Sequence, residues 1–334
     1  MRIGIHHTEN SFSDRWIAYC REKEIPYKLV DCYRSDIVQQ LSGCGALMWH
    51  FNHKDSKDSK FAKQLLFSLQ NAGTRVFPDF STVWHFDDKV GQKYLLEAID
   101  APLAPAHVFY KKKEAILWAG EADFPKVFKL RNGSGSQNVR LVRSREQAVR
   151  LIRKAFGRGF RQYEAWSNLK ERIRKYRLGK TNLWNVVKGL IRLVRPTRYA
   201  RVTGREAGYI YFQDFIPDNE FDIRIIVVGD KAFALKRLVR ENDFRASGSG
   251  FILYEKEHFD DLTVRISFEV SEKMHAQCMT YDFVYMEGKP LIVEISYGFT
   301  VEAYDACEGY WNRDLSWVEG PFNPYGWMVE DMIK

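Results

Sequence analysis

The stretch 281–296 constrains the fold of this chain more than any other, because it has the pattern of a β-hairpin that carries acidic residues. Two apolar runs flank a turn signal over 287–290. Antiparallel pairing about that turn brings Asp282 and Glu294 to the same end of the hairpin, and Ser296 follows two residues later. Hard oxygen groups of this kind suit Mg²⁺, which in turn holds phosphates. The alternative is a hairpin with two ordinary surface acids.

The N-terminal part of the chain alternates strand and helix signals. Short apolar runs at 3–6, 27–30, 46–51 and 75–78 predict strands, and amphipathic stretches between them predict helices. A βαβ pattern of this kind implies a parallel sheet. The sequence lacks GxGxxG, so nothing supports a dinucleotide-binding function. His50 and His53 follow the third predicted strand, and we expect them to be incidental rather than functional.

Composition limits where such a protein works. No run of 18 apolar residues exists, so the sequence predicts no membrane span, and we expect no signal peptide. The five cysteines form no CxxC motif, which favours reduced thiols and a cytoplasmic location.

A Gly/Ser loop lies between two predicted strands, 124–130 and 139–142. Gly133, Ser134, Gly135 and Ser136 form its centre. Glycines let a backbone approach an anion closely, and successive N–H groups can point at phosphate oxygens. Lys129, beside the loop, adds a positive charge. The pattern is typical of a phosphate-binding loop, although an ordinary turn has the same composition.

The order of these motifs resembles the ATP-grasp superfamily over roughly residues 85–299, apart from the basic segment 158–205. The ribosomal-protein glutamate ligases are the nearest likeness, and D-alanine–D-alanine ligase is a more distant one. The resemblance implies an ATP-grasp fold of mixed class, α/β and α+β. We expect an N-terminal parallel-sheet domain over 1–87. A lid subdomain over 88–216 follows, and it includes a basic insertion at 158–205. The C-terminal metal-binding subdomain and an aromatic tail occupy 217–334.

The resemblance also assigns roles to individual residues. It implies that Arg237 and Arg245 face the reacting phosphates as catalytic cations. It implies that Asp282, Glu294 and Ser296 are the Mg²⁺ ligands. The ATP-binding residues that it implies are Lys89, Lys129, Gly133, Ser134, Gly135, Ser136, Gln213, Asp214, Phe215, Ile216 and Asp222.

Four departures from the family pattern stand out. Ser296 replaces the usual Asn, and a hydroxyl is a poorer metal ligand than an amide oxygen. Gln137-Asn138 stands in the loop where a further glycine is common. The basic insertion has no counterpart of its length in the glutamate ligases, and the chain beyond Phe299 does not match them.

The resemblance implies ATP-dependent joining of a carboxylate to an amine through an acyl phosphate, with ATP and Mg²⁺ as cofactors. A phosphorylating enzyme of the same fold is an alternative. A non-catalytic nucleotide-binding module that docks a membrane or a partner is another, because Ser296 departs from the metal-ligand pattern. A cell-surface polysaccharide precursor that bears a uronic acid or an amino sugar is our hypothesis for the substrate.

The positive charge of the chain is concentrated in one segment. Between Arg158 and Arg205 there are 14 Lys and Arg residues and two acids, so this segment carries +12 and the remainder −4. The segment could be a solvated helical hairpin, could bind an acidic glycan, or could lie on an anionic membrane surface at the inner face of the membrane. No recognition motif accompanies the charge, which argues against nucleic acid.

Aromatic residues crowd the chain after Phe299. Seven of them lie between Tyr304 and Trp327. We expect a tail held on the protein body by large buried rings, rather than a platform for sugar rings.

Overall fold

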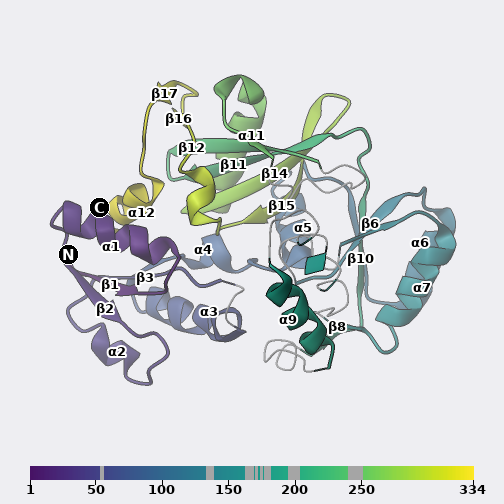
Figure 1. Ribbon diagram of the computed structural model, residues 1–334, viewed down its shortest axis with the longest axis horizontal. Coiled ribbons are helices and arrows are strands. Elements are labelled where there is room, and N and C mark those ends of the chain that lie inside the picture. The colour runs from purple at the N-terminus through teal and green to yellow at the C-terminus, as the bar shows by residue number, and fades with distance from the viewer. Residues whose placement is uncertain are drawn as a thin grey trace. The chain divides into compact units, whose positions relative to one another are not determined.

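The structure is a computed structural model in which the chain forms two compact units (Figure 1). Unit 1 comprises Met1–Ala104 and Ile216–Lys334, and unit 2 comprises Pro105–Phe215. The residues that the structure describes are 1–52, 56–132, 139–161, 169, 172–173, 176, 182–194, 204–239 and 251–334.

The N-terminal sheet of unit 1 is fully parallel and has the strand order β2-β1-β3-β4, which confirms the predicted βαβ pattern. Every residue of β1 and β3, the central strands, is buried, as expected for a sheet covered on both faces. The strands are β1 (Ile3–His6), β2 (Tyr27–Val30), β3 (Ala46–Trp49) and β4 (Arg75–Phe77). The accompanying helices are α1 (Phe12–Glu22), α2 (Ile37–Gln40), α3 (Ser56–Asn71), α4 (Phe80–Val83) and α5 (Lys89–Ala98).

His50 has a structural environment. Strand β3 ends at Trp49, two residues earlier than predicted. The imidazole of His50 stacks on the ring of Phe12 with centroids 3.7 Å apart, and its Nδ1 accepts a hydrogen bond from the Phe12 backbone at 3.1 Å. These contacts agree with the expectation that His50 is incidental to function, whereas His53 lies outside the described residues.

The second sheet of unit 1 is antiparallel and has the order β15-β14-β11-β12-β16-β17, with β13 also paired to β12. Its strands are β11 (Phe221–Val228), β12 (Lys231–Leu238), β13 (Ile252–Leu253), β14 (Cys278–Met286), β15 (Lys289–Ser296), β16 (Gly309–Asn312) and β17 (Trp317–Glu319). The helices of this part are α11 (Asp261–Met274), α12 (Pro324–Ile333) and the short 3₁₀ turns η1 (Lys256–His258) and η2 (Val301–Tyr304).

Helix α11 has a well-defined start and end. It begins after Asp260, whose carboxylate caps the Thr263 N–H at 2.7 Å. It ends at Met274 because His275 takes a left-handed conformation, with φ of 53°. The residues from Cys278 onward therefore belong to strand β14.

The predicted hairpin is confirmed as β14–β15, with a tighter turn than expected. Glu287 and Gly288 both have positive φ, as a two-residue type I′ turn requires. Pro290 lies inside β15, opposite Tyr285, rather than in the turn. A proline is tolerated there because β15 is the terminal strand of the sheet and Pro290 needs no ladder N–H.

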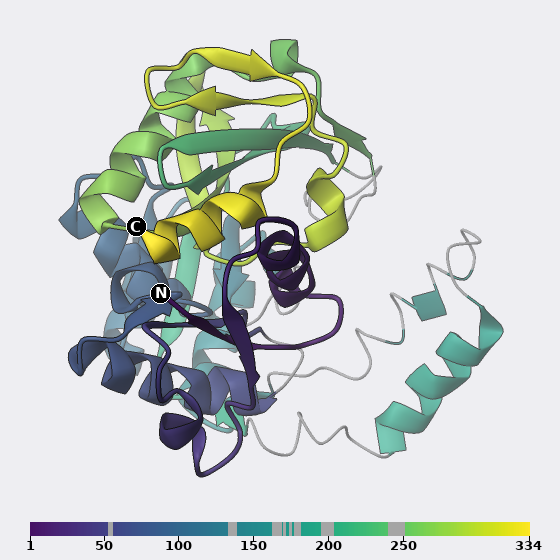
Figure 2. The same ribbon diagram turned by 90° about the vertical axis from the view of Figure 1, so that its left-hand side faces the viewer.

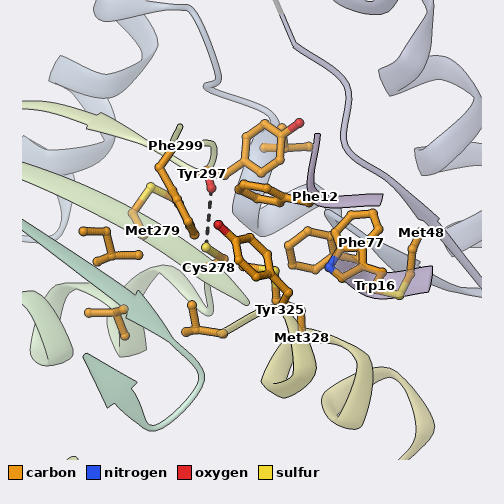
Figure 3. Close-up of a cluster of buried hydrophobic side chains, with 14 of the residues drawn as sticks. Phe12, Trp16, Met48, Phe77, Cys278, Met279, Tyr297, Phe299, Tyr325 and Met328 are labelled. Carbon is orange, nitrogen blue, oxygen red and sulfur yellow. Dashed lines mark hydrogen bonds between the residues drawn. The ribbon is translucent and has the colours of Figure 1, made fainter. Parts of the chain in front are cut away.

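One hydrophobic core joins the two sheets of unit 1. Figure 3 shows Phe12 and Trp16 of α1 beside Tyr297, Phe299 and Tyr325 from the C-terminal part. Helix α12 packs against α1, which it crosses (Figure 2). The N-terminal sheet is therefore held by residues more than 200 positions further along the chain.

The aromatic tail packs into this core, which confirms the prediction of a tail held by buried rings. Tyr304, Trp311 and Tyr325 are at most 5% exposed. The Tyr325 hydroxyl donates to the Val301 carbonyl at 3.0 Å. Tyr310, Trp317, Phe322 and Trp327 are partly buried against the same core.

Unit 2 is built on an antiparallel sheet with the order β5-β10-β6-β7. Phe128 and Phe212 form its core with apolar residues of α6 and α7. The strands are β5 (Ala106–Phe109), β6 (Lys126–Lys129), β7 (Arg140–Val142), β10 (Ile210–Asp214) and the pair β8 (Phe160–Arg161) and β9 (Arg205–Glu206). The helices are α6 (Lys112–Glu121), α7 (Arg145–Ala155) and α9 (Leu183–Val194). None of the described helices is long and apolar enough to cross a membrane.

Candidate functional site

Charged side chains gather on one face of the antiparallel sheet in unit 1. Asp222 on β11 pairs with Arg237 on β12, and Arg224 pairs with Asp282 on β14. Asp282 in turn pairs with Glu294 on β15. Directly opposed residues of antiparallel strands point to the same face, and residues two apart on one strand do as well. The sheet thus brings these five side chains together, and with Lys89 we call them the charged cluster.

Two arginine–carboxylate pairs form the buried part of the charged cluster. Arg224 donates from Nε and Nη2 to the two oxygens of Asp282, at 2.6 and 2.7 Å. Arg237 donates in the same manner to Asp222, at 2.6 and 2.7 Å. The Nη2 of Arg237 also lies 3.1 Å from Oδ1 of Asp282, so the pairs form one network. Bidentate pairs of this kind fix side-chain geometry as well as charge.

A β-bulge determines where Glu294 lies. Phe283 pairs with Ile292, but Asp282 pairs with Glu294, so Val293 is an extra residue on β15. If the regular pairing continued from Phe283 and Ile292, Val293 would stand opposite Asp282, and Glu294 would stand opposite Tyr281. The bulge thus places two carboxylates on adjacent strands at the same level of the sheet.

Lys89 reaches Glu294 from helix α5. Its Nζ lies 3.3 Å from Oε1 of Glu294. Asp88 caps α5 by accepting from the N–H groups of Val90 and Gly91, so the helix begins at Lys89. The Glu294 side chain is 38% exposed, whereas those of Asp282 and Arg237 are each 9% exposed. Glu294 is therefore the carboxylate of the cluster that solvent and solutes reach most easily.

The electrostatics of the cluster favour a charged Asp282. Burial would raise the pKa of Asp282, but Arg224 and Arg237 lower it well below its usual range. Burial raises the pKa of Asp222 to about 6, against the opposite effect of Arg237. Burial also raises the pKa of the Tyr304 hydroxyl to about 12, although Arg224 and Arg237 act to lower it.

Ser296 lies at the end of β15, opposite Thr280. Its hydroxyl donates to the Gly298 carbonyl at 3.0 Å, and its oxygen accepts from the Gly298 N–H at 3.2 Å. The Ser296 oxygen is thus oriented by a local turn on the same face of the sheet as Asp282 and Glu294.

The side-chain oxygens of Asp282, Glu294 and Ser296 are of the chemical type that binds a hard cation. Two carboxylates and one hydroxyl are the oxygen ligands that Mg²⁺ accepts. Within the described ranges, however, no three His, Cys, Asp or Glu side chains are grouped so that they could hold a metal ion. Both oxygens of Asp282 are bonded to arginine, so a cation at Asp282 has to compete with guanidinium groups.

The predicted ATP-binding residues of unit 2 lie on β6 and β10. Lys129 donates from Nζ to Oε1 of Gln213 at 2.7 Å. Lys126 donates to Oδ1 of Asp214 at 2.7 Å, and His107 lies 3.2 Å from the same oxygen. Gln213 and Asp214 are consecutive strand residues, so their side chains point to opposite faces. Asp214 shares a face with the core residues that α6 and α7 cover, and Gln213 and Lys129 share the other face.

The structure leaves part of the predicted site untested. Gly133, Ser134, Gly135, Ser136 and Arg245 lie outside the described residues. Phe215 and Ile216 follow β10 at the boundary between the two units.

Two charged residues were absent from the predicted site although they bond directly to members of it. Arg224 binds Asp282, and Lys126 binds Asp214. A signal for Arg224 was present in the sequence, because it stands two residues after Asp222 and so shares its strand face. No comparable signal distinguished Lys126 from Lys129 before the covered face of the unit 2 sheet was known.

Comparisons with known proteins bear on this architecture. Residues 200–308 match the model of the RimK-like ATP-grasp domain. No curated protein sequence matches the chain. Among solved structures, the chain is similar to a RimK domain protein from Sphaerobacter thermophilus, with a TM-score of 0.55, 12% identity and full coverage of both chains.

Two further structures of known ligases are similar. D-cycloserine synthetase DcsG has a TM-score of 0.61 and 13% identity, with 99% of this chain and 100% of that chain covered. The ATP-grasp ligase PsnB, complexed with precursor peptide PsnA2 and AMPPNP, has a TM-score of 0.56 and 12% identity, with 99% and 97% covered. Another structure of PsnB holds Mg and ADP.

These comparisons and the sheet topology confirm the resemblance that the sequence motifs indicated. The chain has the ATP-grasp fold, and the match to the RimK-like ATP-grasp model covers its residues 200–308.

Proposed function

We propose that the protein is an ATP-dependent carboxylate–amine ligase that works through an acyl phosphate. The match of residues 200–308 to the RimK-like domain and the similarity to ATP-grasp ligases support this class. The single observation that carries the proposal is the pairing of Asp282 with Glu294 beside the buried Arg237 and the half-buried Arg224 on one sheet face.

In the proposed reaction a carboxylate oxygen attacks the γ-phosphorus of ATP and ADP leaves. The amine then attacks the acyl carbon, phosphate leaves, and the amine nitrogen loses a proton to water. Phosphoryl transfer of this kind depends on positioning and charge neutralisation more than on covalent help. We assign charge neutralisation to Arg237, and we add Arg224 as the residue that fixes the orientation of Asp282.

Asp282, Glu294 and Ser296 are the residues that would hold Mg²⁺. The bound ion would neutralise phosphate charge during transfer. Glu294 is the entry point in this proposal because it is the most exposed of the three acids in the cluster. Lys89, 3.3 Å from Glu294, gives the same carboxylate a positively charged neighbour.

We propose that nucleotide binding involves Lys129, Gln213 and the loop Gly133–Ser136. Lys129 and Gln213 are buried and already hydrogen-bonded, so their polar atoms are preorganised. We further assign Asp214, Phe215, Ile216 and Asp222 to nucleotide binding and Arg245 to the reacting phosphates. These assignments rest on the family resemblance.

A cell-surface polysaccharide precursor with a uronic acid or an amino sugar is the substrate that we propose. The basic segment 158–205, at +12, supports an acidic partner. We propose that the reaction takes place in the cytoplasm, and the five free cysteine thiols support a reducing compartment.

The proposal is tested by incubating the purified protein with Mg-ATP and mixtures of uronic acids and amines. We expect ADP release and a product whose mass equals the two substrates minus water. A product that gains a phosphate instead would identify a phosphorylating enzyme of the same fold. Absence of Mg-ATP binding by calorimetry would overturn both activities.

A non-catalytic nucleotide-binding module is the second candidate. The observation that favours it is that Asp282 has both oxygens bonded to arginine, which is a stable arrangement without a metal. In that case Glu294→Gln would leave cellular function intact, whereas neutralising basic residues of 158–205 would abolish it.

A further inference from the structure

Helix α9 exposes large apolar side chains to solvent. Leu183 and Trp184 are 57% and 59% exposed, and Leu190 and Ile191 are each 50% exposed. Burying such side chains is favourable, and all four lie on one helix of 12 residues. A contiguous apolar surface of this kind marks an interaction site rather than ordinary scatter.

These side chains lie on one side of the helix. With 3.6 residues per turn, Leu190, Leu183, Ile191 and Trp184 fall within an arc of about 120°. Gly189 lies on the opposite side and packs closely against Leu169 and Arg172 of the same basic segment. A Cβ at Gly189 would lie 2.9 Å from Leu169 Cδ1 and 3.0 Å from Arg172 Cδ. The helix thus packs through Gly189 and presents its apolar arc outward.

Positive charge borders this arc. Lys188 is exposed and its Nζ lies 5.8 Å from the centre of the Trp184 ring. Arg192 follows four residues after Lys188 in the sequence. The sequence around α9, residues 158–205, carries 14 basic residues against two acids. An apolar arc bordered by Lys and Arg, with a Trp at its edge, complements a surface that is apolar inside and anionic outside.

We propose that α9 docks the protein on a membrane containing anionic lipids. The helix lies in the plane of the interface, with Leu183, Leu190 and Ile191 inserted among the acyl chains and Trp184 at the headgroup level. At 12 residues it is too short to span the bilayer. The basic residues face the lipid phosphates. This role does not depend on the ligase reaction.

The test is sedimentation of the full-length protein with lipid vesicles. Vesicles of phosphatidylglycerol mixed with phosphatidylcholine are compared with vesicles of phosphatidylcholine alone. The double variant Trp184→Ser, Ile191→Ser removes two exposed anchors, and we expect binding to the anionic vesicles to fall by roughly tenfold or more. Lys188→Gln removes one charge and should weaken binding by roughly fivefold.

The matched control is Leu117→Ser on α6, which removes a side chain of similar exposure, 59%, from a helix outside the basic segment 158–205. We expect this variant to bind like the wild type. The proposal is overturned if the wild type ignores anionic vesicles, if it binds both vesicle types equally, or if the α9 double variant binds unchanged. If the wild type binds no vesicles but forms a dimer, and the double variant is a monomer, α9 serves self-association instead.

Discussion

Arg224 and Asp282 face each other across β11 and β14 and share two hydrogen bonds of 2.6 and 2.7 Å. Asp282 is also 3.1 Å from Arg237, so its single negative charge is shared between two guanidinium groups. The residue that the family resemblance implies as a metal ligand is thus also the centre of a buried ion network. Its substitution therefore affects stability as well as any metal.

The first prediction concerns this pair. Arg224→Gln leaves Asp282 with one cationic partner, and breaking a buried pair on one side costs about 3–5 kcal/mol of unfolding free energy. The double variant Arg224→Gln, Asp282→Asn removes both charges and should lose less than the sum of the single losses. Urea unfolding of the wild type and the three variants measures the coupling. Strictly additive losses would show that the pair contributes nothing as a pair.

The second prediction concerns His85. Its side chain is fully buried, and neither ring nitrogen has a hydrogen-bond partner among the described residues. Burial lowers the pKa of His85 from 6.5 to about 3, with Lys63 adding to the effect. Below pH 6.5 the His85 side chain binds a proton in the unfolded chain, whereas in the folded chain it stays neutral down to about pH 3. Stability therefore falls by up to about 1.4 kcal/mol per pH unit as the pH decreases from 6.5 toward 3.

His85→Leu should remove this dependence, so the variant gains stability relative to the wild type as the pH is lowered from 7 to about 5. Urea unfolding at both pH values gives the difference. Val83→Ala is the control, because it truncates a buried side chain nearby that carries no proton. It should lower stability equally at both pH values. A His85→Leu protein with an unchanged pH slope would contradict the lowered pKa.

The third prediction concerns Glu294, the exposed acid of the charged cluster. Glu294→Gln removes a hard ligand without disturbing the buried pairs, so we expect Mg-ATP affinity to fall by roughly 10-fold or more. Calorimetric titration measures it. Glu287→Gln changes an acid at the turn end of the same hairpin and should bind like the wild type. Equal affinity in the two variants would remove Glu294 from the site.

The fourth prediction concerns helix packing. In α12 a Cβ at Gly326 would lie 2.6 Å from the Tyr19 ring, where α12 crosses α1. Gly326→Ala should therefore destabilise the protein, although alanine favours a helix by about 1 kcal/mol over glycine. Gly120→Ala in α6 meets nothing closer than 3.7 Å and should be neutral or stabilising. Thermal unfolding of both variants checks this, and a stabilising Gly326→Ala would contradict the packing.

Local pattern was sufficient to predict the main elements. The period-2 runs on either side of the turn predicted the β14–β15 hairpin, and the βαβ pattern predicted the parallel sheet. Turn chemistry explains the error at Pro290: a two-residue turn with positive φ at Glu287 and Gly288 leaves the proline in the strand. The motif order was sufficient to indicate the ATP-grasp fold.

The tertiary structure decided which side chains meet. The extra residue Val293 puts Glu294 opposite Asp282, and the local sequence pattern does not predict a bulge at that position. Strand order brought β11 between β12 and β14, so Arg224 and Arg237 both reach Asp282. The sequence by itself determined the strands and the acids that they carry, because alternation and turn residues act over a few positions. The partners of those acids depended on register between strands distant in sequence, and only the folded sheet sets that register.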